Sequence, residues 1–130
     1  MSLAGRIAAL AARVGLEFQS KVSHAHPGVA RAWVSFGCID GEIVVYRSFG
    51  VAGVTRRQTG RYRVHFSQPF SDNAYCWMAM ARSNTETGMH PICVVRCDSD
   101  RKSRRYVDLS CATFSVCFAD SSEINLVVYR

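Results

Sequence analysis

The sequence contains no apolar run that approaches the roughly 20 residues needed for a membrane-spanning helix. Its first residues, MSLAGR, lack both the apolar core and the small-residue cleavage site of a secretory signal. We therefore expect a protein that is made and folded in a reducing cytoplasm. In that compartment the even number of cysteines, six, is no sign of a disulfide framework.

The cysteines also lack the spacing of a metal site. No two of them form a CxxC pair, whereas zinc sites normally combine such tight pairs with a second pair or with histidines. Cys93 and Cys97 are four residues apart and Cys111 and Cys117 are six apart, so on strands each pair would share one face. Small buried hydrophobic side chains are the better interpretation of most of the six.

Enzyme motifs are equally scarce. There is no GxSxG, no phosphate-binding glycine loop and no HExxH. The acidic residues fall mainly in predicted turns, where they favour turn formation and solubility. A thiol hydrolase would combine a cysteine with His65 or His90, but no local motif supports that pairing. The sequence thus predicts no catalytic residue, no cofactor and no enzymatic activity.

What the sequence does contain is typical of one packed domain. Of its 130 residues, 48% are apolar, 20% are charged and only three are proline, a balance that argues against disorder. The net charge of +6 favours anionic partners such as nucleic acid, lipopolysaccharide or an anionic membrane face. The basic residues are nevertheless spread along the chain, which favours solvated strand faces and loops over a dedicated nucleic-acid site.

Residues 1–23 differ from the rest of the chain and are predicted to form a helical segment for docking or oligomerisation. Apolar side chains recur there at the spacing of one helical stripe, close to the seam of a coiled coil: Leu3, Ile7, Leu10, Val14 and Phe18. Gly5 and Gly15 weaken a helix by up to about 1 kcal/mol each, so about two heptads are marginal alone. We interpret the stripe as a surface for copies of the chain or a docking partner; packing on its own domain and fraying are the alternatives.

Residues 24–29 are predicted to form a hinge. Pro27 favours an extended conformation for His26, and Gly28 lets the chain turn. On an extended segment His24 and His26 project to the same side, so three copies around a threefold axis would together offer enough imidazole nitrogens to saturate a transition metal. A polar hinge without metal is the simpler interpretation of the same two residues.

From residue 30 to residue 130 the sequence predicts strands throughout. The alternation is clearest at 61–66, where Tyr62, Val64 and Phe66 would face inward. Gly37 is expected to close the first strand. The predicted strands are 31–36, 42–49, 54–58, 61–66, 74–82, 92–97, 104–111, 113–118 and 124–129. We expect about seven or eight of these nine candidate ranges to form strands, which with the frequent turns indicates an all-β domain, either an antiparallel β-sandwich or a squat barrel.

Binding residues are harder to predict than the fold. Trp33 and Trp77 lie within predicted strands, where core packing is the default role. Outward contacts are expected instead at the polar loops 83–90 and 98–105, because binding surfaces concentrate on loops held by a rigid scaffold. No specific binding residue follows from the sequence.

Several short motifs in the strand region resemble a module that is common in tail fibres and related virion proteins of tailed phages. The motifs are RAWVSF at 31–36, VYRSFGV at 45–51, GVTR at 53–56, TGRYRVHF at 59–66 and PFSDNAY at 69–75. They follow the order of the family pattern, which opens with RAWVNF. The HAHP of the hinge also resembles the HTHP that often precedes such modules. The likeness covers about residues 24–77, and SFGVAG at 48–53 replaces the SFNVSS that the family commonly carries.

The resemblance implies a virion component, usually homotrimeric, in the tail or as a fibre or spike elsewhere on the particle. Residues 1–23 would then join copies of the chain or dock on other virion proteins. The sandwich would contact another component or an anionic host-envelope glycan, each contact weak singly and strengthened by multivalency. The alternative function is a small β-barrel that binds single-stranded nucleic acid through four arginines, namely Arg61, Arg63, Arg104 and Arg105.

Overall fold

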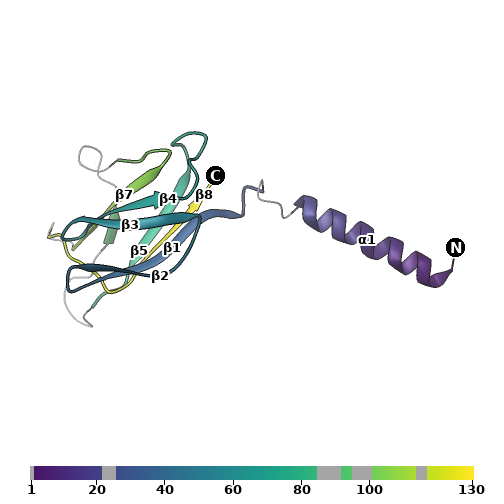
Figure 1. Ribbon diagram of the computed structural model, residues 1–130, viewed down its shortest axis with the longest axis horizontal. Coiled ribbons are helices and arrows are strands. Elements are labelled where there is room, and N and C mark those ends of the chain that lie inside the picture. Colours follow the sequence, from purple (N-terminus) through teal and green to yellow (C-terminus); the bar gives the residue numbers. More distant parts are fainter. Residues whose placement is uncertain (1, 22–25, 85–91, 95–100, 114–116) are drawn as a thin grey trace.

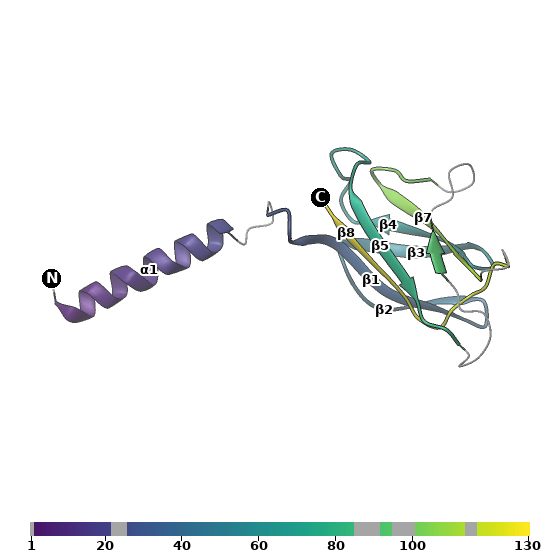
Figure 2. The same ribbon diagram turned by 180° about the vertical axis from the view of Figure 1, so that it is seen from behind.

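The structure is a computed structural model that describes residues 2–21, 26–84, 92–94, 101–113 and 117–130. Within these residues the elements are α1 (Leu3–Lys21), β1 (Ala30–Ile39), β2 (Glu42–Phe49), β3 (Val51–Gln58), β4 (Arg61–Phe66), β5 (Cys76–Ala81), β6 (Ile92–Val94), β7 (Tyr106–Ala112) and β8 (Ile124–Tyr129). The strands form a two-layered body, and α1 lies apart from it (Figures 1 and 2). The predicted β-sandwich with a short N-terminal helix is confirmed.

Each layer is a four-stranded sheet. Sheet A has the strand order β2-β1-β8-β5 and sheet B has the order β3-β4-β7-β6, with every pair antiparallel. The chain crosses from sheet A to sheet B at Gly50, whose φ is 67°. A Cβ at this residue would also press against the backbone of Arg31 and Ala32. Both the dihedral angle and the lack of space therefore require glycine at the crossing.

The core fills the space between the two sheets. The predicted alternation along β4 is confirmed, because Tyr62, Val64 and Phe66 are buried. The ring of Phe36 from sheet A meets the ring of Tyr62 edge-on, with the centroids 5.3 Å apart. The buried apolar residues of the two inner faces and the adjoining loop are Ala32, Val34, Phe36, Cys38, Tyr62, Val64, Phe66, Tyr75, Val107, Leu109, Cys111, Ile124, Leu126 and Val128.

The first strand does not end at Gly37, as the sequence predicts, but continues to Ile39. The absence of a side chain at Gly37 admits the backbone of Ser122, which a Cβ would overlap. The carbonyl of Ser122 in turn accepts a hydrogen bond from the Tyr46 hydroxyl at 2.6 Å. Gly37 is thus a site of close backbone approach rather than a strand end.

Two further strand predictions need correction. β3 begins at Val51 and runs through Gly53, three residues earlier than predicted. For the predicted strand at 113–118, the described part of the chain has only an isolated bridge between Ala112 and Phe118. Residues 114–116 of that prediction lie outside the described residues.

Candidate functional site

The apolar stripe predicted for residues 1–23 is present on α1 and is uncovered. The large apolar side chains of α1 are all exposed: Leu3, Ile7, Leu10, Val14, Leu16 and Phe18. α1 projects away from the sandwich, so its stripe is not packed on its own domain (Figure 1). Burying a leucine- or isoleucine-sized side chain contributes about 1.5–3 kcal/mol of favourable free energy. A second molecule that covers the stripe of α1 would obtain this contribution.

A second apolar surface lies on the outer side of sheet A. Trp33 is directly opposite Phe49 on β2 and Val127 on β8, and Val127 is directly opposite Met78 on β5. These four residues form one row across the sheet because opposed residues of antiparallel strands share a face. Met80 extends the surface by one further row. We call Trp33, Phe49, Met78, Met80 and Val127 the apolar face.

The apolar face is exposed to solvent. Its exposed fractions reach 52% for Phe49, 54% for Met78 and 75% for Met80. Trp33 is 37% exposed, so the prediction of core packing for this tryptophan is wrong. The physical reason is the two-residue period of β1, which turns Ala32 and its alternate neighbours inward and Trp33 outward. Trp77, by contrast, packs partly buried against the core.

The surface above β1, β8 and β5 is hollowed into a groove of about 500 Å³. Trp33, Met78 and Met80 belong to its apolar lining, and Ser35 and Asn125 supply polar atoms. Methionine and tryptophan are typical of surfaces that bind other proteins, because methionine adapts its shape and tryptophan offers a large rigid area. The groove is therefore suited to an apolar partner.

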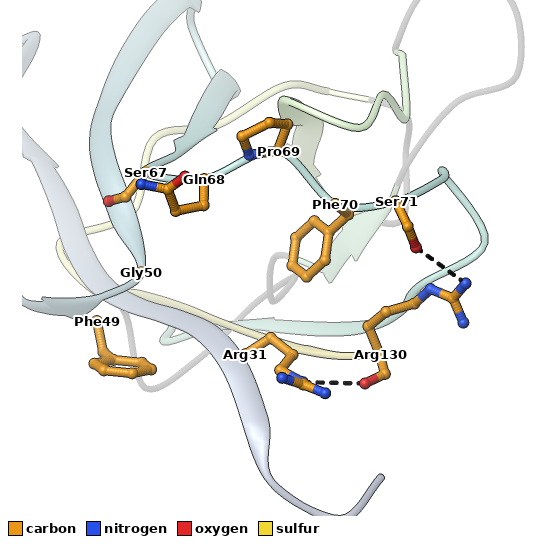
Figure 3. A pocket seen from close by; sticks show the side chains of 9 residues that line it. All are labelled: Arg31, Phe49, Gly50, Ser67, Gln68, Pro69, Phe70, Ser71 and Arg130. Atoms are coloured by element: carbon orange, nitrogen blue, oxygen red, sulfur yellow. Dashed lines mark hydrogen bonds between the residues drawn. The ribbon is translucent and has the colours of Figure 1, made fainter. Parts of the chain in front are cut away.

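A smaller hollow of about 440 Å³ lies at the end of the sandwich from which the chain leads to α1. Figure 3 shows the nine side chains that line it, among them Arg31, Phe49, Phe70 and Arg130. Phe49 belongs to this hollow and to the apolar face, so the two surfaces are continuous. The hollow adds two guanidinium groups to the edge of the apolar face.

The two arginines of the hollow are held differently. The guanidinium of Arg130 bonds to Asp72 at 2.6 Å and to Ser71 at 3.3 Å, so its charge is matched. Arg31 donates through Nε to the Arg130 carbonyl at 3.1 Å. Its two terminal nitrogens have no hydrogen-bond partner among the described residues. A carboxylate of another molecule would best satisfy these two nitrogens of Arg31, because a guanidinium binds a carboxylate with two parallel hydrogen bonds.

The outer side of sheet B carries an ion-pair cluster built from its own strands. The carboxylate of Asp108 on β7 is fully buried and accepts hydrogen bonds from Arg63 at 2.7 and 3.1 Å and from Arg57 at 3.2 Å. It also accepts one from the backbone N–H of Arg101 at 3.0 Å. Lys102 pairs with Val107 through the backbone, so the segment 101–103 lies beside β7 in the plane of sheet B, and Asp108 helps to hold it there. We call Asp108, Arg57, Arg63 and the N–H of Arg101 the Asp108 clamp.

The electrostatics of the Asp108 clamp are those of a structural ion pair. Burial by itself raises the pKa of the Asp108 carboxyl, but the hydrogen bonds from Arg63 and Arg101 and the two guanidinium charges outweigh burial and leave the pKa low. Asp108 therefore stays ionised at neutral pH. A buried carboxylate whose acceptor sites are filled by its own protein has no capacity to act as a base.

A second carboxylate, Asp120, joins residues around the turn between β3 and β4. It accepts hydrogen bonds from Arg56 at 2.7 Å, from the Gly60 N–H at 2.8 Å and from the Tyr62 hydroxyl. Partial burial alone would raise its pKa, but these bonds lower the pKa to about 2. Burial and the bond to Asp120 in turn raise the pKa of Tyr62. Both acids serve the fold, which corrects the expectation that they favour turns and solubility.

Several of the arginines predicted to bind nucleic acid form hydrogen bonds within their own chain. Arg63 belongs to the Asp108 clamp, and its guanidinium lies 4.0 Å from the ring centroid of Tyr106. Arg104 donates to the Phe70 carbonyl at 2.8 Å. Arg61 donates to Gln58 at 3.3 Å. Three of the four arginines thus bond within the chain and hold loops and strands in place rather than forming a groove for a nucleic-acid backbone.

The predicted metal residues are not brought to a test by the structure. His24 lies outside the described residues, as does His90. His26 is exposed, and its Nδ1 accepts a hydrogen bond from the Gly28 N–H at 3.0 Å in a turn closed by Val29. Among the residues described, no cluster of three or more His, Cys, Asp or Glu is arranged to hold a metal ion. A metal at His24 and His26 of three chains stays a prediction.

The loops expected to make outward contacts are only partly described. Residues 85–91 and 95–100 lie outside the described residues, and within the segment 101–105 the Asp108 clamp holds 101–103 alongside β7. In the part of the chain that the structure describes, no helix is both long and apolar enough to cross a bilayer.

The sequence did contain a signal for the apolar face. β5 reads CWMAMA, so apolar residues fill both of its faces rather than alternating with polar ones. Such a pattern is typical of strands that are covered on both sides, yet here one side is bare. No family model, curated protein or solved structure matches this chain significantly.

Proposed function

We propose that this chain is a structural component of a tailed-phage particle that forms a homotrimer through α1 and carries the sandwich as a mounted module. The support is the order of short motifs at 31–75 that resemble tail-fibre modules, together with the separation of α1 from the sandwich. The two carboxylates that join strands of the sandwich, Asp108 and Asp120, are both bound by arginine.

The observation that carries the proposal is the exposed stripe of α1. A helix of 19 residues with two interior glycines is marginal in water by itself. Its stability must come from burial of Leu3, Ile7, Leu10 and Val14 against something else. Copies of the same helix offer a matching stripe, because the spacing of these residues is that of coiled-coil seam positions.

The apolar face extends this assembly. Once three helices associate, their sandwiches are tethered by the short connection between Lys21 and Ala30, and the effective concentration is on the order of millimolar. Large apolar patches on a soluble monomer usually mark an interface. A neighbouring copy is therefore the occupant that we assign to the apolar face.

The position of the hollow suggests its role. It lies at the end of the sandwich that leads to α1, which in a mounted module is the side facing the particle (Figure 1). We assign Arg31 to an acidic group of a neighbouring virion chain rather than to a host glycan. Contact with the host, if the module makes it, belongs to the opposite end, beyond the turn at Asp40 and Gly41.

The test is the mass of the assembly. Light scattering of the full chain is expected to give three times the chain mass, and Leu10→Asp is expected to give the monomer mass because a charge then enters the seam. Ala12→Asp is the matched control, since it adds the same charge on the other side of α1 and should leave the trimer intact. A monomer of the unchanged protein at high concentration would overturn the proposal, as would equal effects of the two variants.

Placement in the particle needs a different measurement. Electron microscopy of an intact virion that encodes this chain is expected to show sandwich density in groups of three on the tail or another appendage. Absence of the chain from purified particles by mass spectrometry would contradict the virion assignment and leave the oligomer result standing.

A further inference from the structure

Two thiols lie opposite each other at the edge of sheet B. Cys93 of β6 is the register partner of Cys111 of β7. Cys111 is fully buried, and Cys93 is partly buried and packs against the core. Both side chains point inward, because opposed residues of antiparallel strands share a face.

The backbone hydrogen bonds show which kind of pair this is. The N–H of Cys111 donates to the Gly60 carbonyl at 2.6 Å, and the Cys111 carbonyl accepts from the Ala119 N–H at 3.1 Å. Both groups therefore point away from β6, since a strand residue directs its N–H and C=O to the same side. Cys93 and Cys111 form a non-hydrogen-bonded pair, whose Cα atoms are typically about 4.5 Å apart. Disulfides span Cα distances of about 4.4–6.8 Å.

The two side chains already interact. The Cys93 thiol donates a hydrogen bond to the Cys111 sulfur, which lowers the pKa of Cys111. The same bond, together with burial, raises the pKa of Cys93. Cys111 is thus the sulfur that loses its proton more readily, and the thiolate is the attacking form in disulfide exchange.

We propose that Cys93 and Cys111 form a cross-strand disulfide when the folded protein meets a low-molecular-weight disulfide such as oxidised glutathione. Cys93, the more accessible sulfur, passes its proton to the Cys111 thiolate and attacks glutathione disulfide; a mixed disulfide with Cys93 forms, and the glutathione thiolate that leaves takes the proton from Cys111. The Cys111 thiolate then attacks the Cys93 sulfur and displaces the second glutathione. The protein loses two S–H hydrogens and gains one S–S bond, while the two glutathione thiolates take up the protons and the electron pair.

The disulfide would link β6, the shortest strand of the sandwich, covalently to β7. β6 has three residues and is an edge of sheet B, where it pairs only with β7 among the described strands. Short edge strands are the part of a sheet most easily lost or re-paired. A chain that folds with reduced cysteines and later enters an oxidising medium would form this disulfide only after folding and assembly. The inference does not depend on the proposed virion role.

The experiment is oxidation of the full chain followed by disulfide mapping. The folded protein is incubated with oxidised glutathione, free thiols are alkylated, and the digested peptides are weighed. The expected product is a Cys93–Cys111 linked peptide pair that carries no glutathione and disappears on reduction. Oxidation is also expected to raise Tm by roughly 10 °C, because the bond closes a short loop in the unfolded chain.

Two variants make the result specific. Cys93→Ser is expected to abolish the rise in Tm, and it is preferred over Cys111→Ser because Cys111 is fully buried in the core. Cys76→Ser removes an exposed cysteine on the other sheet and should keep the full rise. Recovery of Cys93 and Cys111 as free or singly glutathionylated residues would overturn the inference. A bond that links either of them to a different cysteine would overturn it as well.

Discussion

The two outer faces of the sandwich are finished in different ways. On sheet B, the Asp108 clamp binds a buried carboxylate to two arginines and holds the segment 101–103 alongside β7. On sheet A, the corresponding surface carries Trp33, Phe49 and methionines with no covering segment in the described part of the chain. The charged groups on the outer side of sheet B are thus paired within one chain. Sheet A and α1 instead present apolar surfaces, and burying these requires a second molecule.

The largest expected effect comes from removing the buried carboxylate of the Asp108 clamp. Asp108→Ala removes a fully buried carboxylate and leaves Arg57 and Arg63 without their partner, together with the Arg101 N–H. Breaking one side of a buried ion pair typically costs about 3–5 kcal/mol. We expect a loss of this size in the free energy of unfolding, measured by urea titration.

Asp72→Ala is the matched control for that variant. Asp72 bonds to Arg130 at 2.6 Å, but both side chains are largely exposed, so this pair contributes at most about 1 kcal/mol. A similar small loss for Asp108→Ala would show that the clamp does not stabilise sheet B and would remove the contrast between the faces.

Acid is a second way to weaken the carboxylate contacts of sheet B. The pKa of Asp120 is about 2 in the folded protein, below its usual 3.8 in the unfolded chain. A carboxyl with a lowered folded pKa contributes stability that is complete above the unfolded value and is lost as pH falls toward the folded one. For Asp120 this amounts to about 2 kcal/mol, lost between about pH 5 and pH 2. The pKa of Asp108 is lowered as well, so its contribution has the same sign.

The measurement is the free energy of unfolding at several pH values for the unchanged protein and for Asp120→Asn. The variant should be less stable near pH 6, and the difference should shrink as the medium becomes acidic. A difference that stays constant from pH 6 to pH 2 would mean that the bonds from Arg56, Gly60 and Tyr62 do not depend on the charge of Asp120.

The sequence predicts the sandwich well because its main signal is local. Alternation along 61–66 and the apolar runs around it need only the two-residue period of a strand. The same local reasoning fails at Gly37, where the close approach of Ser122 decides the role of the glycine. A residue 85 positions further along the chain leaves no trace in the local pattern around Gly37.

The candidate sites are less predictable because they depend on pairings between distant residues. Asp108 reads as an ordinary polar residue until Arg63 and Arg57, 45 and 51 positions away, are placed beside it. The apolar row likewise needs the register of four strands, since Phe49, Trp33, Val127 and Met78 come from all of them. The helix stripe was predictable because its whole signal lies within 18 residues.

The smallest expected effect on stability comes from a substitution on the exposed apolar face of sheet A. Met80 is 75% exposed on the apolar face, so Met80→Lys should change the free energy of unfolding by no more than about 0.5 kcal/mol. The same change places a charge where neighbouring sandwiches are proposed to meet, and desolvating it should raise the dissociation constant of the assembly by roughly tenfold or more. Sedimentation over a dilution series measures that constant, with urea unfolding as the check on the fold. An unchanged dissociation constant in Met80→Lys, with Leu10→Asp still monomeric, would mean that assembly uses α1 alone and that the apolar face binds a different partner. A large loss in the free energy of unfolding would instead mean that Met80 stabilises its own chain.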